Sequence, residues 1–94
     1  MKKIYIAGKI TGDPDYKAKF LIAQKELQSH GHKVMNPAEL PEGFEFSEYM
    51  KICLAMIDVC DTVYMLNNWG LSKGASIEYL YAQAVGKKIL FQPI

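Results

Sequence analysis

The stretch DTVYML, residues 61–66, decides the fold because it is a short run with almost no polar side chains. After Asp61 it is nearly continuously apolar, which is typical of a parallel strand that is covered on both faces. Three further stretches are predicted as strands because they combine strand-forming residues with turn residues at their ends. They are KKIYIAG (residues 2–8), KVMNP (33–37) and KKILFQP (87–93).

The segment between the first two predicted strands has the apolar spacing of a helix. Its apolar residues step by three and four from Tyr16 onward, as one face of a helix requires. Asp13 and Pro14 suit the start of this helix, with proline in its first turn. Gly31 suits a left-handed cap at its end.

Two more helices are predicted, over residues 48–60 with Ser47 as the cap and over residues 75–85. The chain therefore alternates strand and helix along its length, which predicts a parallel sheet with right-handed crossovers. We expect one domain over residues 1–94 with a three-layer, doubly wound α/β fold. Its four-stranded parallel sheet should have the order 2-1-3-4, which makes the fold flavodoxin- or Rossmann-like.

The composition argues against several classes of partner. The 94 residues carry a net charge of +1, and all 11 basic residues are lysines. So small a charge argues against binding polymeric nucleic acid through a basic face. The apolar run at the start of the chain is too short for a secretion signal or a membrane span. We therefore expect a cytoplasmic protein that does not bind membranes.

The two cysteines are expected to be reduced. Cys53 and Cys60 lie on the same predicted helix, where seven residues correspond to a rise of about 10.5 Å. That separation is too large for a disulfide between them. No spacing of cysteine and histidine suggests a zinc site, and we expect neither a metal nor a cofactor.

Small and polar residues follow the first and third predicted strands, where a doubly wound sheet binds ligands. In the first of these loops Gly8 and Gly12 flank Lys9 and Thr11. Small residues allow backbone N–H groups to approach an anion, and a helix N-terminus favours negative charge. The spacing of the glycines matches neither the phosphate-binding loop of nucleoside triphosphatases nor the G-x-G-x-x-G fingerprint of dinucleotide-binding proteins. A plain turn that needs glycine is an equally good interpretation.

The loop after the third strand, NNWGLSKGAS (residues 67–76), offers hydroxyl groups and room for a ligand. Ser72 and Ser76 supply hydroxyls, and Gly74 permits close approach. The simpler interpretation is that Ser72 caps the following helix. Trp69 is expected either to stack on a base or to cover the edge of the sheet.

Glu78 is an isolated acid in an apolar first part of the third helix. The helix dipole and hydroxyl contacts would lower its pKa, whereas partial desolvation would raise it. A carboxylate nucleophile should be ionised and yet poorly solvated. Tyr5, on the first strand, is placed to donate its hydroxyl to this group. The alternative is an ordinary helix glutamate that faces solvent.

Five segments together resemble a family of small bacterial and phage proteins of unassigned function. That family is similar to the nucleoside 2-deoxyribosyltransferases and to the deoxynucleoside-monophosphate N-glycosidases. The resemblance covers nearly the whole chain, and its most specific part is the small-residue loop that leads into the helical glutamate. The segments are YIAGKITG (5–12), NPAEL (36–40), YM (49–50), CDTVYML (60–66) and NWGLSKGASIEYLYA (68–82).

The resemblance implies a role for each candidate residue. In the transferases the helical glutamate attacks C1′ of a 2′-deoxynucleoside, releases the base and leaves a glycosyl ester that a second base or water then resolves. Glu78 would be that nucleophile, and Tyr5 would orient it. The sugar or 5′-phosphate site would be lined on one side by Gly8, Lys9 and Thr11 and on the other by Ser72 and Gly74.

The sequence departs from the enzyme pattern at two positions. The enzymes carry an aspartate eight residues before the one that opens the third strand, and here that place in the substrate site holds Cys53. A thiol is neutral at pH 7 and is a poor general acid for a base. Asp58 lies roughly 140° further round the helix and cannot take over. Thr11 stands where the glycosidases have an arginine at the phosphate loop.

Two functions follow, with a structural domain that keeps a vestigial cleft as a third reading. The first is a transferase or N-glycosidase that acts on a deoxynucleoside or its monophosphate. The second is a non-catalytic protein that senses or sequesters a nucleotide. In both, the partner is a small nucleoside or nucleotide. We also expect a homodimer or larger oligomer, with Met50, Met56 and Tyr79 available for packing against a second copy.

Overall fold

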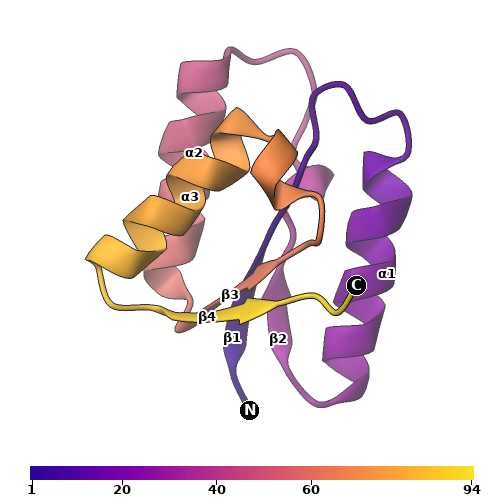
Figure 1. Ribbon diagram of the computed structural model, residues 1–94, viewed down its shortest axis with the longest axis vertical. Coiled ribbons are helices and arrows are strands. Elements are labelled where there is room, and N and C mark those ends of the chain that lie inside the picture. Colours follow the sequence, from indigo (N-terminus) through magenta and orange to yellow (C-terminus); the bar gives the residue numbers. More distant parts are fainter.

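A computed structural model describes all residues from 1 to 94 (Figure 1). The four strands form one parallel sheet in the order β2-β1-β3-β4. This order and the alternation of strands and helices confirm the fold predicted from the sequence. The elements are β1 (Lys3–Ala7), α1 (Tyr16–Ser29), β2 (Lys33–Met35), α2 (Phe46–Val59), β3 (Thr62–Met65), α3 (Lys73–Ala84) and β4 (Lys88–Phe91), with short 3₁₀ turns at Pro37–Glu39 and Trp69–Leu71.

The sheet lies between two helical layers, with α1 on one side and α2 and α3 on the other (Figure 1). Alternate residues of β1 and β3 face opposite layers, so both strands are buried apart from Lys3 at the start of β1. On one side Ile4 and Ile6 pack with Phe20 of α1. On the other side Tyr5 and Val63 pack with the α2 and α3 layer. This two-sided burial is the reason for the continuous apolar character of residues 62–66.

Two predicted helix starts are wrong. Helix α2 begins at Phe46, so Ser47 lies inside its first turn, and the N-cap is Glu45. The backbone N–H of Glu45 donates to Glu48 Oε1 over 2.8 Å, which is half of a capping box. Glu45 serves as the cap in place of Ser47 because Glu48, three residues further along, completes a capping box with it.

Helix α1 begins at Tyr16 rather than beside Pro14. Asp13 Oδ1 accepts a hydrogen bond from the N–H of Asp15 over 2.9 Å, which makes a turn ahead of the helix. Asp13 also bonds Lys19 over 2.8 Å, so the aspartate acts across the first turn rather than as the cap. At the other end of α1, Gly31 has φ of 86°, as expected for a left-handed cap.

Asp61 connects the starts of two neighbouring strands. Its Oδ2 accepts from the N–H of Lys3 over 3.1 Å, and its Oδ1 accepts from the Thr62 hydroxyl over 2.8 Å. These hydrogen bonds lower the pKa of Asp61, and the one from Thr62 has the largest effect. The residue therefore fixes the register of β1 against β3, which positions the loops at the other end of the sheet.

None of the three helices combines the length and the apolar character that crossing a membrane requires.

Candidate active site

The loops after β1 and β3 meet at one end of the sheet, as the strand order predicts. Asn68 joins them: its Oδ1 accepts from the N–H of Lys9 over 3.1 Å, and its Nδ2 donates to Asp13 Oδ2 over 3.4 Å. The loop after β2 reaches the same end, because the carboxyl ends of parallel strands share one edge. These loops therefore surround a common space.

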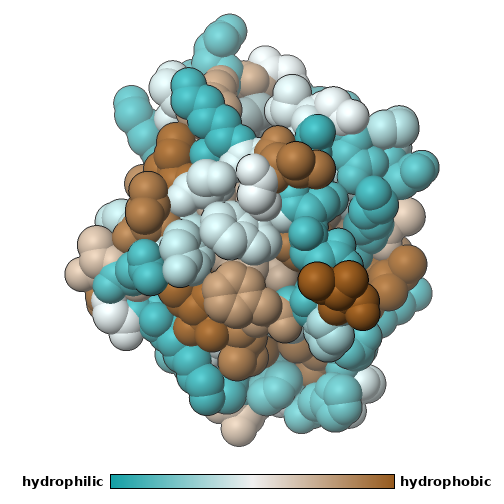
Figure 2. All heavy atoms as spheres, viewed as in Figure 1, coloured by the Kyte–Doolittle hydropathy of each residue, from teal (hydrophilic) through white to brown (hydrophobic).

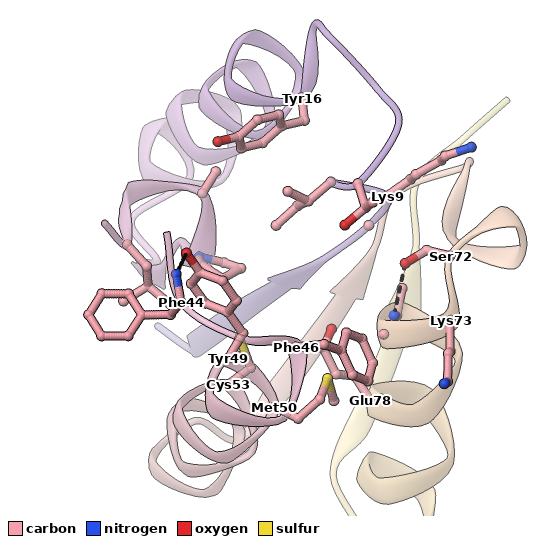
Figure 3. A pocket seen from close by; sticks show the side chains of 18 of the residues that line it. Lys9, Tyr16, Phe44, Phe46, Tyr49, Met50, Cys53, Ser72, Lys73 and Glu78 are labelled. Atoms are coloured by element: carbon pink, nitrogen blue, oxygen red, sulfur yellow. Dashed lines mark hydrogen bonds between the residues drawn. The ribbon is translucent and has the colours of Figure 1, made fainter. Parts of the chain in front are cut away.

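That space is a cavity of about 640 Å³. It contains side chains from both helical layers and from all three loops, and Figure 3 shows Tyr16 across the opening from Phe46 and Met50, with Ser72 and Lys73 along another side. The lining residues are Tyr5, Gly8, Lys9, Ile10, Thr11, Tyr16, Pro37, Ala38, Leu40, Glu42, Gly43, Phe44, Phe46, Tyr49, Met50, Cys53, Leu71, Ser72, Lys73, Gly74, Ala75 and Glu78. The volume is within the range of sites for small organic ligands.

Glu78 lies on the wall of this cavity and is nearly buried, with 5% of its surface exposed. The fully buried Tyr5 donates its hydroxyl proton to Glu78 Oε2 over 2.7 Å, joining residues 73 apart in the sequence. The solvent-facing alternative for Glu78 is therefore wrong. The contact with Tyr5 is the one expected from the sequence.

Burial decides the protonation of this pair. It raises the pKa of Glu78 from 4.5 to about 7, and the hydrogen bonds from Tyr5 and then Cys53 offset only part of that increase. Burial also raises the pKa of Tyr5 well above its usual value, and the neighbouring Glu78 charge adds to the effect. Tyr5 therefore stays a hydroxyl donor at neutral pH, while Glu78 is present in both its neutral and its ionised form.

Cys53 is the third member of this buried group. It lies on α2 with 6% of its surface exposed, and burial is the main reason that the pKa of its thiol rises to about 11. It is a free thiol, as is the buried Cys60. Asp58 does not compensate for Cys53, because it is exposed and accepts a hydrogen bond from the Tyr81 hydroxyl over 2.6 Å.

The structure brings Gly8, Lys9 and Thr11 to the cavity. A Cβ atom on Gly8 would lie 2.7 Å from Leu66 Cδ1, so the close packing of the two strand ends is sufficient reason for glycine here. Figure 3 shows the Lys9 side chain extending outward from the cavity along its rim. The first loop thus supplies a tightly packed glycine, a positive charge at the rim and an exposed hydroxyl group.

The structure places Ser72 and Gly74 on the opposite side. Ser72 is the N-cap of α3, and its Oγ accepts from the N–H of Ala75 over 3.1 Å, as the simpler interpretation held. A Cβ atom on Gly74 would lie 3.5 Å from Phe46 Cε1 and 3.6 Å from the Met50 sulfur. A larger residue at position 74 would therefore fit but would narrow the cavity between α2 and α3.

Trp69 does not line the cavity. Its ring packs against Tyr79 with 4.8 Å between centroids and lies 6.2 Å from the ring of Phe91. Phe91 belongs to the edge strand β4, and apolar side chains gather over that part of the face shown in Figure 2. Of the two expectations for Trp69, covering the sheet edge fits this geometry.

The sequence reasoning missed an aromatic wall. Phe44, Phe46 and Tyr49 come from the loop after β2 and from the start of α2, and Tyr16 comes from the start of α1. Phe44 and Phe46 are 51% and 46% exposed, so their rings are accessible to a ligand in the cavity. Two phenylalanines in the otherwise polar stretch PEGFEF were the available signal.

No group of three or more histidine, cysteine, aspartate or glutamate residues is placed to hold a metal ion.

Comparisons with known proteins give the family and the fold. The family model described as "Domain of unknown function (DUF4406)" matches residues 2–91, so the chain belongs to this family. No curated protein matches the sequence.

Three solved structures share the fold at low sequence identity. A 2-desoxiribosyltransferase from Leishmania mexicana matches 97% of this chain with a TM-score of 0.76 and 23% identity, and the chain spans 63% of that protein's length. A 2-deoxyribosyltransferase from Bacillus psychrosaccharolyticus gives a TM-score of 0.74 with 22% identity, and the match covers 95% of this chain and 70% of that enzyme. The CMP N-glycosidase of Clostridium botulinum gives a TM-score of 0.72 with 23% identity, and the match covers 96% of this chain and 70% of the glycosidase.

Proposed function

We propose that this member of the DUF4406 family binds a nucleoside or nucleotide in the cavity and cleaves or transfers its N-glycosidic bond, with Glu78 as the nucleophile. The observation that carries the proposal is the placement of Glu78: nearly buried, open to a 640 Å³ cavity, and held by the Tyr5 hydroxyl at 2.7 Å. The shared fold with two 2-deoxyribosyltransferases and a CMP N-glycosidase supports the same class of reaction.

The reaction proceeds by two displacements at C1′ of the sugar. The ionised carboxylate of Glu78 attacks C1′, the bond to the base nitrogen breaks, and a glycosyl ester forms on the enzyme. Water or a second base then attacks C1′ and regenerates the carboxylate. Both transition states resemble an oxocarbenium ion, which a fixed and poorly solvated carboxylate stabilises. Tyr5 acts as a positioning residue that holds one carboxylate oxygen.

The sugar or its 5′-phosphate lies between the two glycine-containing loops. Gly8, Lys9 and Thr11 line one side of this subsite, and Ser72 and Gly74 line the other. Ser72 satisfies the N–H of Ala75, which leaves the N–H groups of Lys73 and Gly74 at the start of α3 to bind an anionic group of the ligand. The chain has no arginine, and Lys9 and Lys73 supply the positive charges at this rim.

A second candidate is a non-catalytic nucleotide-binding protein. The observation that favours it is Cys53, a thiol with a pKa of about 11 beside the carboxylate, where a stronger acid would help a base to leave. General acid catalysis contributes about 10²- to 10⁴-fold in rate. A site without it binds the same ligand and turns it over slowly or not at all.

Release of free base distinguishes the two candidates. We expect that incubation with 2′-deoxynucleosides and their 5′-monophosphates yields free base, detected by chromatography. Addition of a second base should yield a new nucleoside if the protein is a transferase, and only free sugar if it is a hydrolase. A nucleotide-dependent rise in the melting temperature without base release would identify the binding protein instead.

We further propose that the chain acts as a homodimer in the cytoplasm, with residues 1–94 as a single transferase-like domain. Tyr79 packs on Trp69 beside the exposed Phe91, and Met56 is only partly buried, so the α2 and α3 layer offers an apolar contact surface. Met50 is directed to the cavity and is less available. Light scattering at micromolar concentration should give the mass of a dimer, and the mass of one chain would contradict this.

A further inference from the structure

The cavity around Glu78 contains a nucleophile but no strong acid. Its lining includes no histidine and no aspartate, and Glu42 is the only other carboxyl group. The Glu42 carboxylate is exposed and pairs with Lys17 over 3.3 Å. An ionised, paired carboxylate accepts protons and does not supply one to a leaving base.

The remaining polar side chains are weak acids or have their protons engaged. Tyr5 donates to Glu78, and the Tyr49 hydroxyl donates to the Pro41 carbonyl over 2.6 Å. Cys53 contributes a neutral thiol next to the carboxylate. Tyr16 adds one phenol.

The two lysines of the cavity do not approach Glu78 with their charged ends. Figure 3 shows the Lys9 side chain extending outward, and the Lys73 ammonium lies over the ring of Phe46, 5.1 Å from its centroid. Both charges therefore belong to the rim. A neutral base that departs with its bonding electron pair would find no group beside Glu78 that readily gives it a proton.

The same cavity favours a positive charge on the base. Tyr16, Phe44, Phe46 and Tyr49 line it with aromatic rings, and a ring face attracts a cation. Lysine ammonium groups lie over the rings of Phe46, at 5.1 Å from the centroid, and Tyr16, at 5.9 Å, so two rings of this wall already bind cations within the protein. The ionised form of Glu78 adds a negative charge at the buried end of the cavity, whereas the charge of Glu42 is balanced by Lys17.

We propose that the substrate of this cavity is an N-glycoside whose base carries a fixed positive charge, such as an N7-alkylated purine or a pyridinium nucleoside. This inference rests on the proposed function, since it assumes that Glu78 attacks C1′. It goes further by naming the chemical class of the leaving group.

The fixed charge removes the need for an acid. As a Glu78 oxygen bonds to C1′, the bond from C1′ to the base nitrogen breaks, and its electron pair neutralises the positive ring. The base leaves as a stable neutral molecule without taking up a proton. Water then attacks C1′ of the glycosyl ester, the carboxylate leaves, and the proton of the attacking water passes to solvent.

A matched pair of nucleosides tests the inference. We expect kcat/KM for 7-methyl-2′-deoxyguanosine to exceed that for 2′-deoxyguanosine by about 100-fold or more, after subtraction of the uncatalysed rates. The 5′-monophosphates should show the same ratio if the phosphate is bound. Equal kcat/KM values would overturn the inference and leave the proposed function standing, whereas release from neither compound contradicts both.

Substitutions at Cys53 provide the second arm. Cys53→Asp places an acid beside Glu78 and should increase kcat/KM for 2′-deoxyguanosine by about tenfold or more, with little change for the methylated compound. Cys53→Ser is the neutral control of similar size and should leave the ratio between the two substrates unchanged. An equal effect of Cys53→Asp on both substrates would count against the inference. If that variant does not fold, the wild-type ratio still decides the question.

Discussion

Glu78→Gln should abolish base release, lowering kcat/KM by about 10³-fold or more. The amide has nearly the same shape as the carboxyl group, and its oxygen can still accept the Tyr5 hydroxyl that now lies 2.7 Å from Glu78 Oε2. It has no negative charge, however, and cannot form the glycosyl ester. Chromatography of the free base measures the rate, and intact-mass spectrometry should show the glycosyl adduct on the wild-type chain only.

Glu26→Gln is the matched control, because it makes the same chemical change at an exposed position on α1. It should leave the rate unchanged.

The wild-type rate should also rise with pH and level off above about pH 7, as burial places the pKa of Glu78 there. At pH 5 about 1% of the Glu78 carboxyl group is ionised, so the rate should be about 100-fold lower than on the plateau at high pH. Undiminished base release by Glu78→Gln would remove Glu78 from the mechanism.

The same substitution should stabilise the protein at alkaline pH. The folded chain raises the pKa of Glu78 from 4.5 to about 7. Below pH 4.5 both folded and unfolded states hold the proton, and the folded state has no disadvantage. Between about pH 4.5 and 7 the unfolded chain releases the proton first, so the free energy of unfolding falls by about 3 kcal/mol and then stays level.

Glu78→Gln has no proton to release and should not show this fall. We therefore expect it to be about 3 kcal/mol more stable than wild type at pH 8 and of similar stability at pH 4. Urea unfolding at pH 4, 6 and 8 measures the difference, with Glu26→Gln following the wild type throughout. A difference between Glu78→Gln and wild type that is the same at every pH would mean that the folded pKa is not raised.

The sheet could be predicted because its pattern is unusually clear. A strand covered on both faces leaves little room for polar residues, and residues 62–66 are all buried. The helix starts were less predictable, since Ser47 is a good cap by type and only the Glu45–Glu48 contact shows which residue serves. Local chemistry offers several caps within one turn, and tertiary packing selects among them.

The candidate site could be predicted in part. The strand order places the loops after β1 and β3 together, and Glu78 and Tyr5 follow from their positions on α3 and β1. The path of the loop that carries Phe44 has no periodic signal, so its aromatic rings were missed. The direction of the shift in the pKa of Glu78 was also open, because burial raises this pKa and hydrogen bonds lower it, and only the three-dimensional surroundings show that the effect of burial is larger.

Asn68 has a consequence for ligand affinity. One amide side chain accepts from Lys9 and donates to Asp13, so folding already fixes the relative position of the two loops. Ordering a loop residue costs about 1–2 kcal/mol in conformational entropy. Because this rim is preorganised, a ligand that enters between the loops loses little of its binding free energy to immobilising them.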